Sequence, residues 1–571
     1  MTAVRLPGRV HIAATLCGAL AVGSVSLNAQ RTSPTASRPL PDSLRSKVDA
    51  VFTGWDRSNS PGCALGISEQ GRVVYERGYG ISDLQHALAI APQSIFHVAS
   101  VSKQFTAFAV AMLAQDGKLS LDDDVRKHIP ELPVYSTPIT VRQLMHHTSG
   151  LRDQWQLLGY AGWRFPEDLI TERDVMNIVQ RQRGLNFTPQ AEWVYSNTGF
   201  TLLAVIVERV SGQSLRDFAQ QRIFTPLGMT RTHFHDDHTM IVPGRTSAYA
   251  PRPGGWRISL PVFDTYGATS LFSTTGDLLT WMANLDQPTV GSAALVADAQ
   301  KSAVLSDGTP ANYGYGLSLG TYRGLPVIGH GGADAGYRAQ IERYPSRGLG
   351  IAVLCNAASA VPSVLARRVA DVMLGSSVPP DATAAPDSTA YAATPAQLDR
   401  WVGVYRDSVA QTVMRVRRTG EGLRLGDGRS LTPTSDTSAR VGTGSGRLVL
   451  RIEKGEVTGV RQLPRGLRDV VLRRETAVTP SKALLAPYVG TYYSAELDVR
   501  YELVSNDTVL ALKHRKFNGN ALLRAEFVDG FSSTMGATFL FTRDAKKRIT
   551  GFTLSDGRVR GVRFEREAPQ R

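Results

Sequence analysis

The chain of 571 residues is poor in cysteine, and cysteine chemistry therefore explains little of it. Of its 3 cysteines, Cys17 lies near the N-terminus, and only Cys63 and Cys355 lie in the main body of the sequence. Two thiols exclude a small disulfide-rich scaffold and a cysteine metal site. Both lie in strand-like apolar runs, so two buried free thiols and one cross-strand disulfide both remain open.

The chain also lacks a block of basic residues, although its formal net charge is +14. Lysines and arginines are scattered, without a stripe that alternates them with aromatic residues. The contents of 42% hydrophobic and 20% charged residues are ordinary for a soluble globular protein. We therefore expect no nucleic-acid partner and attribute the charge to solubility or to weak attraction for anionic envelope polymers.

Long apolar runs are absent except at the N-terminus. Arg5 and Arg9 precede a mostly apolar stretch over 10–27, and Leu27-Asn28-Ala29 resembles a cleavage site. This pattern predicts a signal peptide over residues 1–29 and hence an exported protein, periplasmic or secreted. No later run is long enough to span a bilayer, so we expect no integral membrane segment after cleavage.

The length and texture of the chain predict several domains. A polar spacer precedes a region that mixes strands with long helices; a linker rich in Ala, Pro, Ser and Thr follows, and then come short alternating strands. Similar openings, Trp401-Val402-Gly403-Val404-Tyr405 and Tyr488-Val489-Gly490-Thr491-Tyr492, predict two copies of one small all-β, barrel-like module. The expected parts are the disordered spacer 30–40, the mixed domain 41–375 with helices near 100–116, 173–183, 198–211 and 275–284, the linker 376–396, and the β-modules 397–476 and 483–571.

Ser100 opens the only Ser-x-x-Lys of the chain, ahead of an apolar run at helical spacing. Residues three apart share one helix face, so the Ser100 hydroxyl and the Lys103 amine can meet. Unpaired N–H groups at a helix N-terminus favour negative charge. With a desolvated, neutral Lys103, Ser100 would be an acylating nucleophile. The alternative is an ordinary N-terminal serine beside a solvated lysine.

Two later motifs could complete such a site. The first motif, Tyr195-Ser196-Asn197, precedes a predicted helix. The Tyr195 phenol could shuttle protons, and the Asn197 side-chain amide both donates and accepts hydrogen bonds. A glycine-rich segment around His330 permits close approach to a substrate and exposes N–H groups that could bind an oxyanion. Taken singly, these motifs equally fit a packed tyrosine, a capping asparagine and an ordinary turn.

In this order, Ser-x-x-Lys, Tyr-x-Asn and His-x-Gly resemble the serine hydrolases related to class C β-lactamases, penicillin-binding peptidases and D-aminopeptidases. The likeness extends over roughly 45–375 and includes Ile139 to Leu151, Pro226-Leu227-Gly228-Met229 and Gly267 to Leu278. It implies an α/β (α+β) β-lactamase/transpeptidase-like domain, with a mixed sheet beside an all-helical region. It implies neither a metal nor a cofactor.

The resemblance also implies a role for each motif residue. It also makes the first and last strands of the domain neighbours, which would put Cys63 and Cys355 on adjacent strands. The roles are Ser100 as acylated nucleophile, Lys103 and Tyr195 as general base and acid, Asn197, His330 and Gly332 as substrate-binding positions, and the backbone N–H groups of Ser100 and Ala333 as oxyanion hole.

His330 departs from the β-lactamase pattern, because many β-lactamases carry a lysine there. A histidine is neutral much of the time, whereas lysine is a permanent cation suited to a substrate carboxylate. A His-x-Gly motif and two β-modules resemble D-aminopeptidases and some esterases of the family more than true β-lactamases. Gln190 also replaces the glycine that commonly follows Pro189 in relatives, which would reshape the approach to Tyr195.

We therefore predict an exported serine hydrolase that forms an acyl-enzyme with small peptides, amides or esters, cell-wall peptides among them. The alternatives are a β-lactamase or D,D-carboxypeptidase, and a non-catalytic scaffold that binds cell-wall peptides. A metal hydrolase using the His233 to His238 cluster is less favoured, because that polar run is typical of a solvated loop. Segment 514–520 would either close over the cleft or pack structurally. No motif indicates the substrate's stereochemistry or the oligomeric state.

Overall fold

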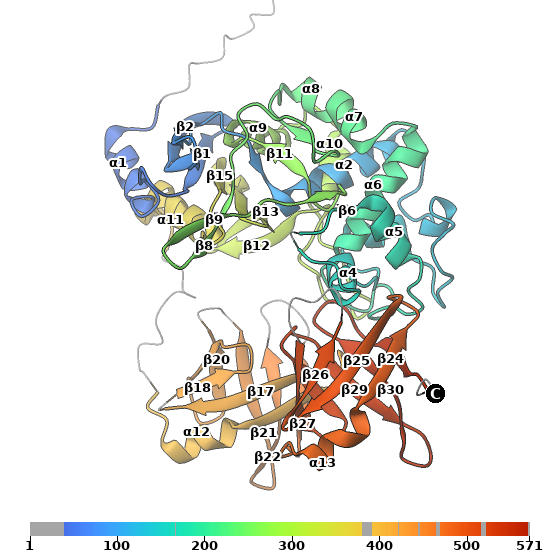
Figure 1. Ribbon diagram of the computed structural model, residues 1–571. Coiled ribbons are helices and arrows are strands. Elements are labelled where there is room, and N and C mark those ends of the chain that lie inside the picture. The colour runs from blue at the N-terminus through green and yellow to red at the C-terminus, as the bar shows by residue number, and fades with distance from the viewer. Residues whose placement is uncertain are drawn as a thin grey trace, which may run out of the picture. The chain divides into compact units, whose positions relative to one another are not determined.

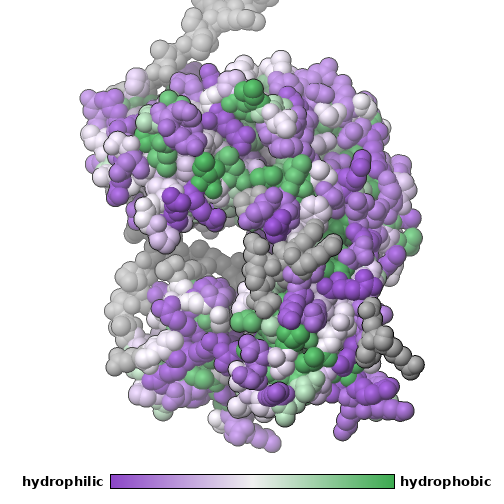
Figure 2. All heavy atoms as spheres, viewed as in Figure 1, coloured by the Kyte–Doolittle hydropathy of each residue, from purple (hydrophilic) through white to green (hydrophobic). Residues whose placement is uncertain are grey.

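A computed structural model describes residues 39–165, 167–379, 391–420, 422–442, 446–463, 469–514 and 521–568. The predicted signal peptide and most of the predicted spacer lie outside these ranges. Among the described residues, no helix is long and apolar enough to cross a bilayer. Figure 2 shows a face on which polar residues dominate and apolar residues are scattered in small groups.

A six-stranded sheet forms the frame of the first domain (Figure 1). All its neighbouring pairs are antiparallel, while a parallel pair joins the two short strands β6 (Ile170–Thr171) and β10 (Phe263–Asp264) elsewhere. The first strand pairs with the last, as the family resemblance implies. In spatial order the strands are β12 (Ser318–Tyr322), β13 (Leu325–Asp334), β14 (Tyr337–Tyr344), β15 (Leu349–Cys355), β1 (Cys63–Glu69) and β2 (Arg72–Tyr79).

Helices cover both faces of this sheet, because successive strand side chains point to opposite faces. Leu65 packs with α1 (Asp42–Val51) and α11 (Pro362–Leu374) in one buried cluster. On the other face, α9 (Thr275–Asn284) approaches so closely that a Cβ on Gly66 would lie 2.9 Å from its side chains. The sheet is therefore buried between two helical layers.

The all-helical region beside the sheet is built around α2, whose residues are almost all buried. The helix predicted at 100–116 starts as a 3-10 turn over Ala99–Val101, and the one predicted at 173–183 ends at Val179. The helices of this region are α2 (Ser102–Gln115), α3 (Val141–Met145), α4 (Gln154–Tyr160), α5 (Glu172–Val179), α6 (Asn197–Ser211), α7 (Leu215–Ala219), α8 (Thr225–Leu227) and α10 (Ala293–Ala299).

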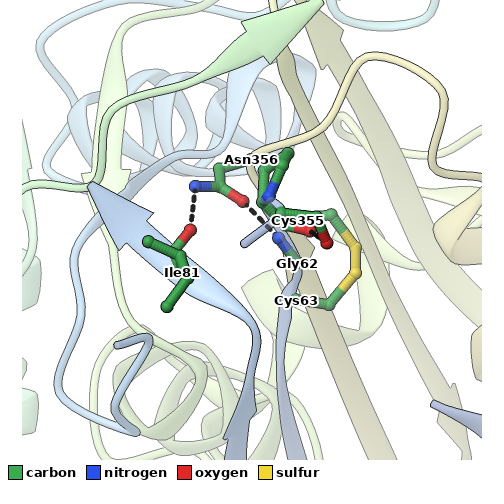
Figure 3. Close-up of a disulfide and its surroundings, with 7 residues drawn as sticks. Gly62, Cys63, Ile81, Cys355 and Asn356 are labelled. Carbon is green, nitrogen blue, oxygen red and sulfur yellow. Dashed lines mark hydrogen bonds between the residues drawn. A yellow bond between two sulfur atoms is a disulfide. The ribbon is translucent and has the colours of Figure 1, made fainter. Parts of the chain in front are cut away.

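Cys63 and Cys355 face each other in the β1–β15 register and form a disulfide, with their Cα atoms 4.0 Å apart. The structure thus decides between the two arrangements that the sequence left open. Figure 3 shows the Asn356 amide next to this bond; it accepts from the Gly62 N–H at 2.8 Å and donates to the Ile81 carbonyl at 2.9 Å. The disulfide therefore joins β1 and β15 at the same end where the Asn356 side chain, just after β15, hydrogen-bonds to Gly62, just before β1.

Two closed eight-stranded barrels follow, as the repeated openings predict. A short helix leads into each, α12 (Pro395–Trp401) and α13 (Lys482–Leu485). The first barrel comprises β16 (Gly403–Asp407), β17 (Thr412–Thr419), β18 (Gly422–Leu425), β19 (Ser430–Pro433), β20 (Ser438–Val441), β21 (Arg447–Glu453), β22 (Glu456–Leu463) and β23 (Val470–Glu475). The second comprises β24 (Gly490–Ser494), β25 (Val499–Asn506), β26 (Val509–Lys513), β27 (Ala521–Phe527), β28 (Gly530–Ser533), β29 (Thr538–Arg543), β30 (Ile549–Ser555) and β31 (Val562–Arg566).

The repeated openings make the same contacts in both barrels. The Tyr405 hydroxyl donates to the Trp401 carbonyl at 2.9 Å, and the Tyr492 hydroxyl donates to the Tyr488 carbonyl at 2.8 Å. Each phenol is buried against its own barrel core and satisfied four residues upstream. The similarity of the two motifs therefore reflects the same hydrogen bond, made by the last tyrosine of each opening to a carbonyl four residues upstream.

Candidate active site

Ser100 lies in the 3-10 turn that precedes α2, at a point where the backbone is tightly constrained. Ala99 has a φ of +48°, an uncommon conformation for a residue with a side chain. Strand β13 passes directly beside this turn, because a Cβ on Gly332 would lie 2.2 Å from the Val98 carbonyl oxygen. Only glycine fits at 332, and its presence brings the predicted oxyanion-hole residue Ala333 close to Ser100.

Lys103 lies one turn after Ser100 and is completely buried. Its Nζ is 3.1 Å from the Ser100 Oγ, 2.8 Å from the Asn197 Oδ1 and 2.6 Å from the Ala268 carbonyl oxygen. Burial lowers the pKa of Lys103 from 10.5 to about 7. The amide and carbonyl oxygens can only accept, so they take both N–H groups of a neutral amine and leave its lone pair for the Ser100 hydroxyl.

Asp153 holds Asn197 in the orientation that Lys103 requires. Its Oδ2 accepts from both the backbone N–H and the side-chain Nδ2 of Asn197, each at 2.7 Å. The Asn197 Oδ1 is thereby turned toward Lys103. Sequence reasoning missed Asp153, because it lies 44 positions before Asn197 and outside the motifs.

Tyr195 shares a hydrogen bond with Ser100, and its ring lies 4.9 Å from the Lys103 Nζ. Burial raises the pKa of Tyr195 despite that hydrogen bond. Its ring packs 4.2 Å from the His147 ring, whose Nδ1 accepts from the Ser196 N–H at 3.1 Å. Tyr195 is therefore a fixed, protonated phenol, suited to pass a proton on rather than to start as the base.

His330 is also buried, and burial together with nearby Lys103 lowers its pKa to about 4. Its Nδ1 lies 2.5 Å from the Gly331 carbonyl, which can only accept, so Nδ1 carries the proton. The Tyr313 hydroxyl then donates to the free Nε2 at 2.8 Å. Both nitrogens are occupied in a neutral ring, and His330 does not supply the cation that a lysine would supply there.

The predicted site residues meet at one cavity of about 640 Å³. Lys103 lies beneath its floor, in contact with Ser100. Trp155, Phe165 and Phe263 form an apolar side. The predicted residues that line the cavity are Ser100, Tyr195, Asn197, His330, Gly332 and Ala333.

The second barrel also contributes to this cavity, through Arg558 in the loop between β30 and β31. The Arg558 guanidinium lies 4.8 Å from the centre of the Tyr195 ring. The loop predicted to close over the cleft is a different one: His514 packs against Gly162, and 515–520 lie outside the described residues. Nothing in the sequence distinguishes Arg558 from the other scattered arginines.

Gln190 has a φ of +71°, in the left-handed region that favours glycine. Its side chain accepts from the Thr148 hydroxyl at 3.1 Å and donates to the Val304 carbonyl at 2.5 Å. These bonds hold a residue that would otherwise avoid the left-handed region. They fix the chain five residues before Tyr195.

The sequence suggested a solvated loop for the His233 to His238 run, and this prediction holds for Asp237 and His238, which are exposed, but not for the start of the run. His235 is buried, and His233 begins the short strand β7 (His233–Phe234). Asp237, His238 and the more distant Asp264 bring possible metal-ligand atoms within 4.8 Å of one another on an exposed surface. That group does not line the cavity that holds Ser100.

Comparison with known proteins places these residues in a family. A family model described as Beta-lactamase matches residues 48–374. A D-aminopeptidase of Gluconobacter oxydans (strain 621H) is 27% identical over 330 residues, which are 58% of this chain but only 62% of that protein. A D-aminopeptidase of Brucella anthropi is 25% identical over 523 residues, 89% of this chain and 96% of that protein.

A solved structure shares the fold. It is the octameric penicillin-binding protein homologue from Pyrococcus abyssi, with a TM-score of 0.54 and 22% sequence identity. The match covers 76% of this chain and 99% of that chain.

Proposed function

The chain belongs to the β-lactamase family of serine hydrolases, and from that premise we propose that Ser100 is acylated by small amides or peptides. The observation that carries the proposal is the environment of Lys103. A lysine with a pKa of about 7, whose two N–H groups are held by acceptors, directs its lone pair at the Ser100 hydroxyl. That is the arrangement of a nucleophile with its base.

The proposed reaction uses the cavity residues in sequence. Lys103 takes the Ser100 proton as Oγ attacks the carbonyl carbon, and the N–H groups of Ser100 and Ala333 stabilise the oxyanion. Tyr195 gives its proton to the leaving nitrogen and is reprotonated from Lys103. Water then hydrolyses the ester along the same proton path in reverse.

Amide and peptide bonds are the proposed targets because the relatives named above are D-aminopeptidases. Asp334 supports this choice, since it is the acidic side chain among the described residues that line the cavity. A carboxylate there suits a substrate with a free amino group. The neutral His330 gives no support to a β-lactamase role.

We also propose that the protein is exported. The N-terminal sequence pattern supports this, and so does the Cys63–Cys355 disulfide, because disulfides persist mainly in oxidising compartments. Fractionation of cells that express the full chain tests this, with N-terminal sequencing of the exported form.

Acylation is tested with intact-mass spectrometry on a panel of D- and L-aminoacyl amides, p-nitrophenyl esters and nitrocefin. We expect a mass increase at Ser100 and turnover of amides and esters in the wild-type protein. Ser100→Ala should lose both, whereas Ser43→Ala, an exposed serine on α1, should keep both. Full turnover by Ser100→Ala would show that the proposal is wrong.

A further inference from the structure

Among the described residues, the cavity that holds Ser100 is lined by an arginine whose guanidinium has no hydrogen-bond partner and by a carboxylate with one oxygen that accepts no hydrogen bond. Three fully charged side chains line it: Asp334, Arg338 and Arg558. Arg338 is partly engaged, because its Nη1 donates to the Ala335 carbonyl at 2.9 Å and the Tyr337 carbonyl at 2.6 Å. Within the described ranges, the Arg558 guanidinium makes no hydrogen bond or ion pair and rests on the Tyr195 ring.

The catalytic domain holds the Arg558 loop firmly. The Arg558 carbonyl accepts from the Asn186 Nδ2 at 2.8 Å and from the Asp153 N–H at 3.2 Å. Arg560 forms a two-pronged ion pair with Glu192, at 3.1 and 3.0 Å. These bonds fix the loop backbone at Arg558, so less loop ordering is left to lose when the guanidinium binds a ligand.

Asp334 is held equally firmly but keeps one oxygen open. Its Oδ2 accepts from the Thr269 hydroxyl at 2.8 Å and lies 3.2 Å from the His97 Nε2. Across the part of the chain that the structure describes, no hydrogen bond reaches its Oδ1. The Asp334 side chain is 25% exposed, so this oxygen can meet a ligand without rearrangement.

The two charges lie toward opposite ends of one stretch of β13. Every second residue of a strand points to the same face, so His330, Gly332 and Asp334 share one face of β13. Arg558 belongs to the His330 end, because His330 and Arg558 both flank the Tyr195 ring, at 6.2 and 4.8 Å. The Cα atoms of His330 and Asp334 are separated by four residues of strand, about 13 Å. The turn that holds Ser100 packs against Gly332, between those two residues, through Val98 and Ala99.

We propose that the substrate is an unblocked dipeptide, with its ammonium group at Asp334 and its carboxylate at Arg558. This inference rests on the proposed acylation of Ser100 and names the substrate of that reaction. Two extended residues span about 7 Å, and an ion-pair contact of about 2.8 Å at each end gives such a molecule a reach of about 13 Å between its two charged partners. The peptide carbonyl of such a molecule falls midway, at Ser100.

The chemistry of the leaving group agrees with this orientation. The Ser100 Oγ–carbon bond forms as the carbon–nitrogen bond breaks, and the leaving nitrogen takes its proton from Tyr195. The released product is an amino acid, whose carboxylate is one carbon away from that nitrogen. A carboxylate beside Tyr195 is therefore beside Arg558, which packs on the same ring.

The apolar side of the cavity indicates the first residue of the dipeptide. Phe263 lies edge-on to His97, the partner of Asp334, at 6.1 Å, and Trp155 packs 5.3 Å from Phe263. These rings are next to the predicted ammonium site. We expect an aromatic or large aliphatic side chain on the N-terminal residue.

The test uses the four stereoisomers of phenylalanyl-alanine, each with a free or amidated carboxyl group and a free or acetylated amino group. Products are measured by mass spectrometry with the full-length wild-type protein, Arg558→Gln, Asp334→Asn and Arg563→Gln. Arg563 is an exposed arginine of the same barrel and serves as the matched control. Ratios of kcat/KM for two substrates on one preparation do not depend on the fraction that is folded.

For the stereoisomer that is cleaved, we expect the free dipeptide to exceed its amide roughly 10- to 100-fold in kcat/KM, the range of charged hydrogen bonds. Arg558→Gln should remove the preference for the free carboxylate and keep that for the free amine; Asp334→Asn should do the reverse. Arg563→Gln should keep both preferences.

Equal cleavage of free and blocked dipeptides by the wild type would overturn the inference. So would an Arg558→Gln variant that keeps the wild-type ratio of kcat/KM for the free acid to that for the amide. If no phenylalanyl-alanine is cleaved while a p-nitrophenyl ester still acylates Ser100, the dipeptide inference fails and the proposed function stands. If Ser100 is not acylated at all, the proposed function itself fails.

Discussion

Lys103 should set the pH dependence of Ser100 acylation, because only the neutral amine can accept the serine proton. Burial brings its pKa from 10.5 to about 7. With that pKa, roughly a tenth of the lysine is neutral at pH 6 and roughly nine-tenths at pH 8. With an unshifted pKa, less than about one in a hundred would be neutral at pH 8, and the neutral fraction would still rise tenfold per pH unit at pH 9.

The measurement is the second-order rate constant for labelling of Ser100 by a fluorophosphonate probe between pH 5 and 9. We expect a tenfold rise per pH unit at low pH, half of the maximal rate near pH 7 and a plateau above about pH 8. A rate that still climbs at pH 9, or that ignores pH throughout, would refute the assignment of Lys103 as base. Single labelling events avoid the complication of slow deacylation.

A change at Arg558 sharpens this test. Its positive charge lowers the pKa of Lys103, while Asp153 and Asp334 raise it. Arg558→Gln removes the cation, so the midpoint of the rate profile should move to higher pH. Arg563→Gln should leave the midpoint in place, and a shift of the Arg558→Gln profile to lower pH would contradict the electrostatic reasoning.

Three further predictions concern the site and its support. Asn197→Ala removes the Lys103 acceptor at 2.8 Å and should slow acylation about 10- to 100-fold, measured with the same probe; an unchanged rate would remove Asn197 from the machinery. Replacing both cysteines by alanine opens a cross-link over 292 positions and should cost about 2–5 kcal/mol in the free energy of unfolding, seen in urea titrations; a wild-type midpoint insensitive to reductant would contradict this. Glu496→Gln leaves Arg152 buried without its charge partner and should lower the free energy of unfolding by about 3–5 kcal/mol. The control Glu565→Gln, on the exposed face of β31, should change the urea midpoint little. Equal urea midpoints for the two variants would show that the buried pair contributes nothing.

Local chemistry explains which parts of the site could be predicted from sequence. Ser100 and Lys103 lie three positions apart on a helical turn, and Tyr195 and Asn197 flank a helix start, so short-range spacing alone brings each pair together. The repeated Trp/Tyr-Val-Gly-x-Tyr openings predicted the barrels for the same reason, since the hydroxyl of the last tyrosine in each opening donates to a carbonyl only four residues upstream.

Distant contacts explain what could not be predicted. Asp153 orients Asn197 across 44 positions, and the Tyr313 hydroxyl donates to the Nε2 of His330 across 17. Each is an ordinary residue in its own segment. The prediction was wrong for His235, because its polar sequence neighbours suggested exposure to solvent, whereas tertiary packing buries its side chain.

The sequence by itself determined the candidate nucleophile and its candidate base, the order of the three motifs and the succession of one mixed domain and two barrels. The tertiary structure decided the state of these groups. Burial makes Lys103 a base near neutral pH and keeps His330 uncharged. The barrel loop brings Arg558 to Tyr195 although 363 positions separate them in the numbering (558 minus 195). Desolvation and long-range charge depend on what surrounds a residue in space, and no motif in the chain encodes that.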